Sequence, residues 1–93
     1  MPSIFIYKGY RIYFWMGDGG EPVHVHVCKG KPSANATKIW ITSGGGCLLA
    51  HNKSKIPLRE LNQIMLVVAA DATRIVELWQ SFFGRVAFYC QLL

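Results

Sequence analysis

Hydrophobic and polar residues alternate along the first half of the chain, and a longer period replaces this alternation in the second half. A period of two residues is typical of strands that are buried on one side. Turn-forming Gly, Pro, Asn and Asp residues separate the alternating segments. The pattern predicts four strands and a short fifth one, at residues 4–8, 11–16, 23–28, 36–42 and 47–51.

From Leu61 onward the apolar positions are spaced alternately by four and three residues, which indicates one apolar stripe along a helix. The stripe consists of Leu61, Met65, Val68, Ala72, Ile75, Trp79 and Phe82. Pro57 suits the first helical turn, and Gly84 is expected to end the helical region. Asp71 could cap a second helix, so one long helix and two short helices both satisfy the pattern.

Strands followed by helices indicate an α+β fold. We expect a mostly antiparallel sheet of four to five strands, with one long or two short C-terminal helices packed on one face. A chain of 93 residues has room for one core, so we expect a single domain over residues 1–84 and an apolar tail at 85–93. Hydrophobic residues make up 52% of the chain, and this high share leaves a homodimer open as one way to bury apolar surface.

The alternation also sorts the residues of each strand onto two faces of the sheet. One face is aliphatic and should lie under the helix stripe: Ile12, Phe14, Met16, Val23, Val25, Val27, Ile39 and Ile41. The other face carries cations and large rings: Arg11, Tyr13, Trp15, His24, His26, Lys38 and Trp40. Rings with polar tips are enriched at recognition surfaces, so we expect this second face to be free and to bind a partner. The alternative is that loops or the apolar tail cover it.

Charge and cysteine usage narrow the classes of protein that remain. The formal net charge of +5 is compatible with a nucleic acid or an acidic partner, although the ten Lys and Arg residues are scattered. Three cysteines without a Cys-x-x-Cys pair argue against a secreted disulfide framework and against a zinc ribbon. The sequence shows neither a membrane span nor a signal peptide, so we expect a cytoplasmic protein.

The segment Glu21-Pro22-Val23-His24-Val25-His26-Val27 is the most distinctive chemical feature, and it allows four interpretations. His24 and His26 share a strand face, as metal ligands would, but only Glu21, Cys28 and His51 offer further ligands, so we assign neither a metal nor a cofactor. The two histidines could instead divide acid and base roles in RNA cleavage. They could take part in recognition. Finally, they could have a structural role and satisfy loop carbonyl groups.

The chain resembles a family of small bacterial and phage proteins that carry a Glu-Pro-Pro-His-Val-His-Val motif and are classed as a domain of unknown function. The resemblance rests on the start of the chain, on Arg11-Ile12-Tyr13-Phe14, on the histidine segment, and on a late pattern that includes Trp79 and Phe83-Gly84. It covers about residues 1–84, and the motif falls on Glu21, Pro22, His24 and His26. Val23 departs from the second proline of the motif. The resemblance implies a partner encoded by a neighbouring gene, in an arrangement like that of toxin–antitoxin pairs.

These observations together favour a small interaction module that acts through the face of histidines, aromatic rings and cations. Glu21, Arg11, Tyr13, Trp15, Lys38 and Trp40 are its expected binding residues. A ribonuclease that uses His24 and His26 as catalytic residues is the first alternative, and a nucleic-acid-binding domain is the second.

Overall fold

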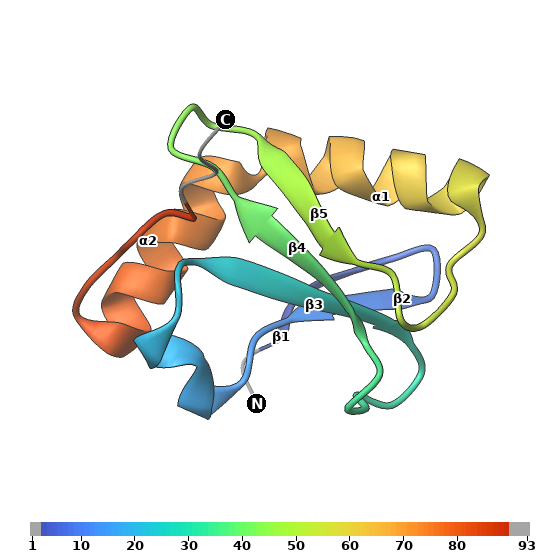
Figure 1. Ribbon diagram of the computed structural model, residues 1–93, viewed down its shortest axis with the longest axis horizontal. Coiled ribbons are helices and arrows are strands. Elements are labelled where there is room, and N and C mark those ends of the chain that lie inside the picture. Colours follow the sequence, from blue (N-terminus) through green and yellow to red (C-terminus); the bar gives the residue numbers. More distant parts are fainter. Residues whose placement is uncertain (1–2, 90–93) are drawn as a thin grey trace.

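The computed structural model describes residues 3–89, and it contains a five-stranded antiparallel sheet followed by two helices (Figure 1). The strands are β1 (Ser3–Tyr7), β2 (Tyr10–Tyr13), β3 (His24–Lys29), β4 (Thr37–Ile41) and β5 (Cys47–His51). The helices are α1 (Leu58–Ala70) and α2 (Ala72–Phe83), and a short 3-10 helix, η1, spans Met16–Gly20. The predicted α+β class, with helices after the sheet, is confirmed. Residues 90–93 of the expected tail lie outside the described residues.

The sheet is a simple meander in which each strand pairs with the next one along the chain, in the order β1-β2-β3-β4-β5. The first turn is tight: Lys8 and Gly9 both have positive φ, at 49° and 84°. Two successive left-handed residues match the right-handed twist of a two-residue hairpin, which is why a glycine suits this position. Because the order is sequential, the turn after β1, the loop after β3 and the loop after β5 all lie at one end of the sheet (Figure 1).

The hydrophobic core lies between one face of the sheet and the two helices. The strands contribute the aliphatic residues that alternation predicts, and the helices contribute an apolar stripe that includes Trp79, which is fully buried. The main buried residues are Ile12, Phe14, Val23, Val25, Val27, Ile39, Ile41, Leu61, Ile64, Val68, Ala72, Ile75 and Trp79. Full burial of one large aliphatic side chain contributes about 1.5–3 kcal/mol, so this layer supplies most of the stability.

The second strand is shorter than the pattern predicts, because the chain leaves the sheet after Tyr13. Phe14 turns into the core against Trp79, with the ring centroids 5.2 Å apart. Trp15 and Asp18 then close the 3-10 helix, in which the Asp18 N–H donates to the Trp15 carbonyl over 3.1 Å. The prediction of a core position for Met16 is therefore wrong: its side chain is 60% exposed.

The helical region is two helices that meet at Asp71, which settles the alternative that the sequence left open. Asp71 precedes α2, but its carboxylate makes no capping hydrogen bond. It instead binds the Arg74 guanidinium, with the shortest contact, Nη2 to Oδ2, at 2.7 Å. Gly84 ends α2 in the left-handed region, with φ of 75°, and its N–H donates to the Gln80 carbonyl over 2.8 Å. Phe82, expected in the buried stripe, is 49% exposed.

Beyond α2, the described part of the tail returns to the sheet. The Val23 N–H donates to the Ala87 carbonyl over 2.8 Å, so the tail satisfies the backbone group that precedes β3. Within residues 3–89, neither helix has the length and apolar character needed to cross a lipid bilayer.

Candidate functional site

The sheet register brings the sequence-predicted site residues of the strands together on the face away from α1, where the His24 ring also meets Trp79 of α2. Tyr13 pairs with His26, which in turn pairs with Lys38. His24 pairs with Trp40 on the same two strands. Directly opposed side chains lie close enough to interact, so this part of the alternation argument placed neighbours correctly.

This face is not free, which corrects the sequence-based expectation. Tyr13 and His24 are both 0% exposed, and Cys28 is almost completely buried. The loop after β3 covers one part: Tyr13, Cys28 and Ala36 form a small second core, and the Cys28 thiol lies 3.3 Å from the Lys31 carbonyl oxygen. The 3-10 helix and the tail cover the rest. Alternation assigns a side chain to a face, but only tertiary structure decides what lies on that face.

Six rings follow one another across this face and form what we call the ring row. In order they are Trp15, Tyr13, His26, His24, Trp40 and Tyr89. Neighbouring centroids lie 4.7–5.6 Å apart, within the range of attractive aromatic contacts. Trp15 and Tyr89 are 39% and 40% exposed, whereas the rings between them are buried or half-buried. The row therefore reaches solvent mainly at its two ends.

The charged residues of this face are already engaged with other groups. The Lys38 ammonium lies 2.6 Å from a Glu21 carboxylate oxygen and 4.3 Å from the centroid of the Trp40 ring. An Arg11 Nη1 contacts the Ser3 hydroxyl at 3.4 Å, and its Nε is buried without a hydrogen-bond partner among the described residues. Glu21 and Lys38 thus neutralise each other, which reduces the positive charge that this face offers to a partner.

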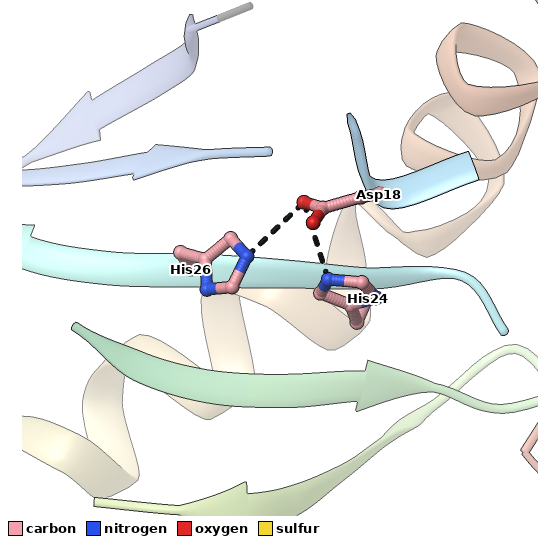
Figure 2. Close-up of side chains that lie close together, drawn as sticks. All are labelled: Asp18, His24 and His26. Atoms are coloured by element: carbon pink, nitrogen blue, oxygen red, sulfur yellow. Dashed lines mark hydrogen bonds and ion pairs between the residues drawn. The ribbon is translucent and has the colours of Figure 1, made fainter. Parts of the chain in front are cut away.

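Asp18 is the residue of this site that sequence reasoning missed. Its Oδ2 accepts a hydrogen bond from the Trp15 backbone N–H at 2.7 Å, which fixes the carboxylate within the 3-10 helix. From there it faces both histidines of β3 (Figure 2). Oδ2 lies 3.1 Å from His26 Nε2 and 3.3 Å from His24 Nε2. The only sequence signal was an acidic residue between glycines, six positions before His24, and such a pattern is common in loops.

The two histidines make different hydrogen bonds. His26 Nε2 forms one with Asp18. His24 Nδ1 lies 2.8 Å from the Pro22 carbonyl oxygen, which can only accept, so this nitrogen carries a hydrogen. His24 therefore does satisfy a loop carbonyl, as the structural interpretation of the segment expects. Its Nε2 is close to Asp18 but buried, and it lacks the geometry of a hydrogen bond to any described residue.

Burial sets the protonation of the more accessible histidine. It lowers the pKa of His26 below its ordinary value, and the neighbouring His24 lowers it further. Asp18 acts in the opposite direction, but the pKa stays lowered. The neutral imidazole of His26 is therefore the favoured form near pH 7, and this is the form that coordinates metals.

The ligand atoms of Asp18, His24 and His26 all lie within 4.8 Å of one another, and we call these three residues the Asp18 cluster. Among the described residues, this group could hold a metal ion. The further ligands that the sequence suggested lie elsewhere. Glu21 binds Lys38, and Cys28 contacts Tyr13 and the Lys31 carbonyl. His51, on β5, pairs with Lys38 of β4. Burial and the nearby Lys53 lower the pKa of His51.

The exposed cations are concentrated at the other end of the sheet from Asp18. The turn after β1, the loop after β3 and the loop after β5 share that end with the start of α1. Six exposed cations lie there, and we call them the basic end: Lys8, Lys29, Lys31, Lys53, Lys55 and Arg59. They are six of the ten Lys and Arg residues, and Glu60 is the one acidic residue beside them. A pattern that looks scattered in the sequence is thus concentrated by the meander.

Three surface depressions of the described chain lie away from Asp18, His24 and His26. One is lined by Thr42, Ala72, Val76 and Phe88, between the turn after β4 and the start of α2. Others lie beside α1, around Arg74 and around Met65.

Comparison with curated proteins and with solved structures gave no match. A family model described as "Domain of unknown function (DUF4160)" matches residues 9–80, which include β2 to β5, the Asp18 cluster, all of α1 and most of α2. The chain therefore belongs to the DUF4160 family of domains of unknown function.

Proposed function

We propose that this protein is a small interaction module that acts in the cytoplasm as one component of a bacterial or phage two-gene unit. Its partner is a small protein encoded by a neighbouring gene. Support for the pairing comes from the resemblance of the histidine segment to a motif whose carriers stand beside a second small gene. The observation that carries the interaction itself is the ring row, whose two ends are exposed on an otherwise covered sheet face.

The exposed ends of the ring row suit protein recognition. Trp15 rests edge-on against Tyr13 at 5.4 Å, and Met16 beside it is 60% exposed. Exposed tryptophan residues next to a rigid buried layer offer a large contact area at little cost in side-chain entropy, and methionine adds adaptable apolar area. Such residues supply most of the binding free energy in known interfaces. The covered centre of the row holds these anchors in place.

The test is co-purification of the protein with the product of the adjacent gene. Trp15→Ala should weaken the complex by more than about 2 kcal/mol if this residue is an anchor. Leu66→Ala is the matched control, because Leu66 is an exposed hydrophobic residue on α1, outside the ring row. Full binding by a folded Trp15→Ala, Tyr89→Ala double variant would contradict the proposal. Growth of a host that expresses the protein with and without its neighbour tests the toxin–antitoxin aspect separately.

A nucleic acid is the second candidate partner, and the basic end is the observation that favours it. Six exposed cations with one neighbouring carboxylate form a positive surface that attracts phosphate. Binding of a labelled duplex should fall steeply with salt, and each lost phosphate contact should reduce the logarithmic salt slope by about 0.9. Lys31→Gln and Lys53→Gln should reduce the slope, whereas Arg74→Gln, at a cation outside the basic end, should not. If the salt slope is the same in the wild type and in all three variants, the basic end does not bind the nucleic acid.

The geometry argues against the ribonuclease alternative. His24 is 0% exposed, so it cannot reach the phosphate of an RNA strand, and His26 alone cannot divide the acid and base roles. Lys38, which would hold the phosphate, is paired with Glu21. We expect the purified protein to leave RNA intact over a broad range of pH and salt. Cleavage that disappears in His26→Ala would restore the alternative.

A further inference from the structure

We propose that Asp18, His24 and His26 form a binding site for a divalent transition-metal ion of the zinc or iron(II) class. This inference does not depend on the proposed interaction with a protein partner. It rests on the directions in which three side chains from two elements point, and on a buried nitrogen that has no hydrogen-bond partner within residues 3–89.

His24 is held in one orientation by its neighbours. Its Nδ1 donates to the Pro22 carbonyl at 2.8 Å, and in the neutral ring the lone pair is therefore on Nε2. A backbone carbonyl bound to one imidazole nitrogen is the usual way to fix the tautomer and ring orientation of a metal-ligating histidine. The ring is also wedged between Trp79 and Trp40, with centroids 5.2 and 5.6 Å away. His24 is thus held with Nε2 in one direction.

His24 Nε2 faces the carboxylate of Asp18. It is fully buried and has no hydrogen-bond partner among the described residues, although Asp18 Oδ2 is only 3.3 Å away. A lone pair and a carboxylate oxygen repel each other at this distance unless a positive charge lies close to both. A proton on Nε2 would not point along the line of a hydrogen bond to Asp18, because the required geometry is absent. A cation that both atoms ligate satisfies them together.

His26 brings a third ligand atom to the same carboxylate. His26 Nε2 lies 3.1 Å from the same carboxylate oxygen, and all three ligand atoms lie within 4.8 Å of one another (Figure 2). Two ligands at about 2.1 Å from a tetrahedral ion are separated by about 3.4 Å, and the two nitrogen–oxygen distances of 3.1 and 3.3 Å are close to this value. The widest separation within the group, up to 4.8 Å, would have to shorten when the ion binds. The carboxylate is itself held by the Trp15 N–H at 2.7 Å, as outer-shell support requires.

The donor set determines the class of ion. Two imidazole nitrogens and one carboxylate favour zinc, iron(II) and similar ions over calcium and magnesium, which prefer oxygen ligands. The side chains of His26 and Asp18 are 15% and 12% exposed, so the partly accessible side of the cluster leaves room for a water molecule or an exchangeable ligand. An ion here would also tie the 3-10 helix to β3, which would stabilise a small domain.

The experiment uses the full chain after treatment with a chelator and titrates it with Zn²⁺ in a calorimeter. We expect a single binding site, a rise in the melting temperature, and no comparable effect of Mg²⁺. Co²⁺ should give visible absorption bands of nitrogen and oxygen ligation, without thiolate charge-transfer bands. Absence of Zn²⁺ binding by the folded wild-type chain would overturn the proposal, and so would a preference for Mg²⁺.

Variants locate the ion. Asp18→Asn and His26→Gln keep side-chain size, and each should weaken Zn²⁺ binding roughly 100-fold or more, at least the effect of losing an outer-shell partner. His51→Ala is the matched control, because His51 lies on the sheet outside the cluster, and it should bind as the wild type does. Circular dichroism establishes that each variant is folded. Wild-type affinity in both folded cluster variants, or binding that is lost in Cys28→Ser or Cys47→Ser, would show that the ion is held elsewhere.

Discussion

The indole of Trp40 and the phenol of Tyr89 stack almost in parallel, with ring centroids 4.7 Å apart and planes inclined by 7°. Trp40 lies on β4, between β3 and the edge strand β5, and Tyr89 is the last described residue of the tail. Together with the hydrogen bond between Val23 and Ala87, this contact fastens the tail beside the histidines. The tail is therefore part of the site.

Tyr89→Ala should uncover Trp40 and lower the free energy of unfolding by about 0.5–1.5 kcal/mol, the usual value of an aromatic pair. Urea unfolding followed by circular dichroism measures the change, and tryptophan emission should shift to longer wavelength as Trp40 becomes hydrated. A double-mutant cycle with Trp40→Ala isolates the contact. A coupling energy near zero would mean that the two rings are neighbours without mutual stabilisation.

Gly19→Ala should destabilise the 3-10 helix. A Cβ at Gly19 would lie 2.6 Å from Cδ1 of the Phe83 ring, so the ring or the helix must move. We expect a loss of about 1–3 kcal/mol, as in other overpacked sites. Gly17→Ala and Gly20→Ala are matched controls in the same helix, because no atom would lie within 4 Å of their added Cβ. Equal stability of all three variants would contradict this account of Gly19.

Asn52→Ala should destabilise the connection between β5 and α1. The Asn52 amide accepts from the Thr37 hydroxyl at 2.6 Å and from the Ile56 N–H at 3.0 Å, and it donates to the Ile56 carbonyl at 2.9 Å. Its removal leaves the buried Thr37 hydroxyl with fewer partners, at a cost of about 1–3 kcal/mol. Asn62→Ala, at an exposed position of α1, should change the melting temperature little. A melting temperature that is lower for Asn62→Ala than for Asn52→Ala would refute the role of this hydrogen-bond network.

The Tyr10 phenol should make stability depend on alkaline pH. Its hydroxyl donates to Glu60 at 2.6 Å, and this bond, together with burial, raises the pKa of Tyr10 from 10.0 to about 12. Because the folded-state pKa lies above the unfolded one, the stabilisation is complete below pH 10 and is lost as the pH rises through about 12.

Tyr10→Phe tests this linkage. The stability difference between the wild type and Tyr10→Phe should shrink between pH 10 and 12. A phenolate absorbance titration should lose one late-titrating group in the variant, while Tyr13, whose pKa burial also raises, still titrates late. Glu60→Gln should bring the pKa of Tyr10 back toward its ordinary value. If the titration curves of the wild type and Glu60→Gln are identical, Glu60 is not the cause of the raised pKa of Tyr10.

Periodicity in the sequence was sufficient for the fold class and for most residues of the core, although it wrongly placed Met16 and Phe82 there. The reason is physical: strand side chains alternate by geometry, so Val23, Val25 and Val27 must share one side and His24 and His26 the other. The break between the helices was visible only as two alternatives at Asp71. Periodicity survives such a break because the apolar stripe of α2 continues that of α1.

Only the tertiary structure decided what lies over the histidine face and which acidic residue meets it. Local sequence patterns do not predict the distance between Asp18 and the histidines of β3. That distance depends on how the chain turns after Phe14 and on the packing of Gly19 against Phe83. Burial of Tyr13 and His24 depends on the loop after β3 and on the tail, which are remote in sequence. The sequence by itself determined which side chains share a face of the sheet, because side chains alternate between the two faces along each strand. The tertiary structure determined which of these side chains are covered, which form ion pairs and which lie close to Asp18, because these properties depend on contacts between segments that are distant in the sequence.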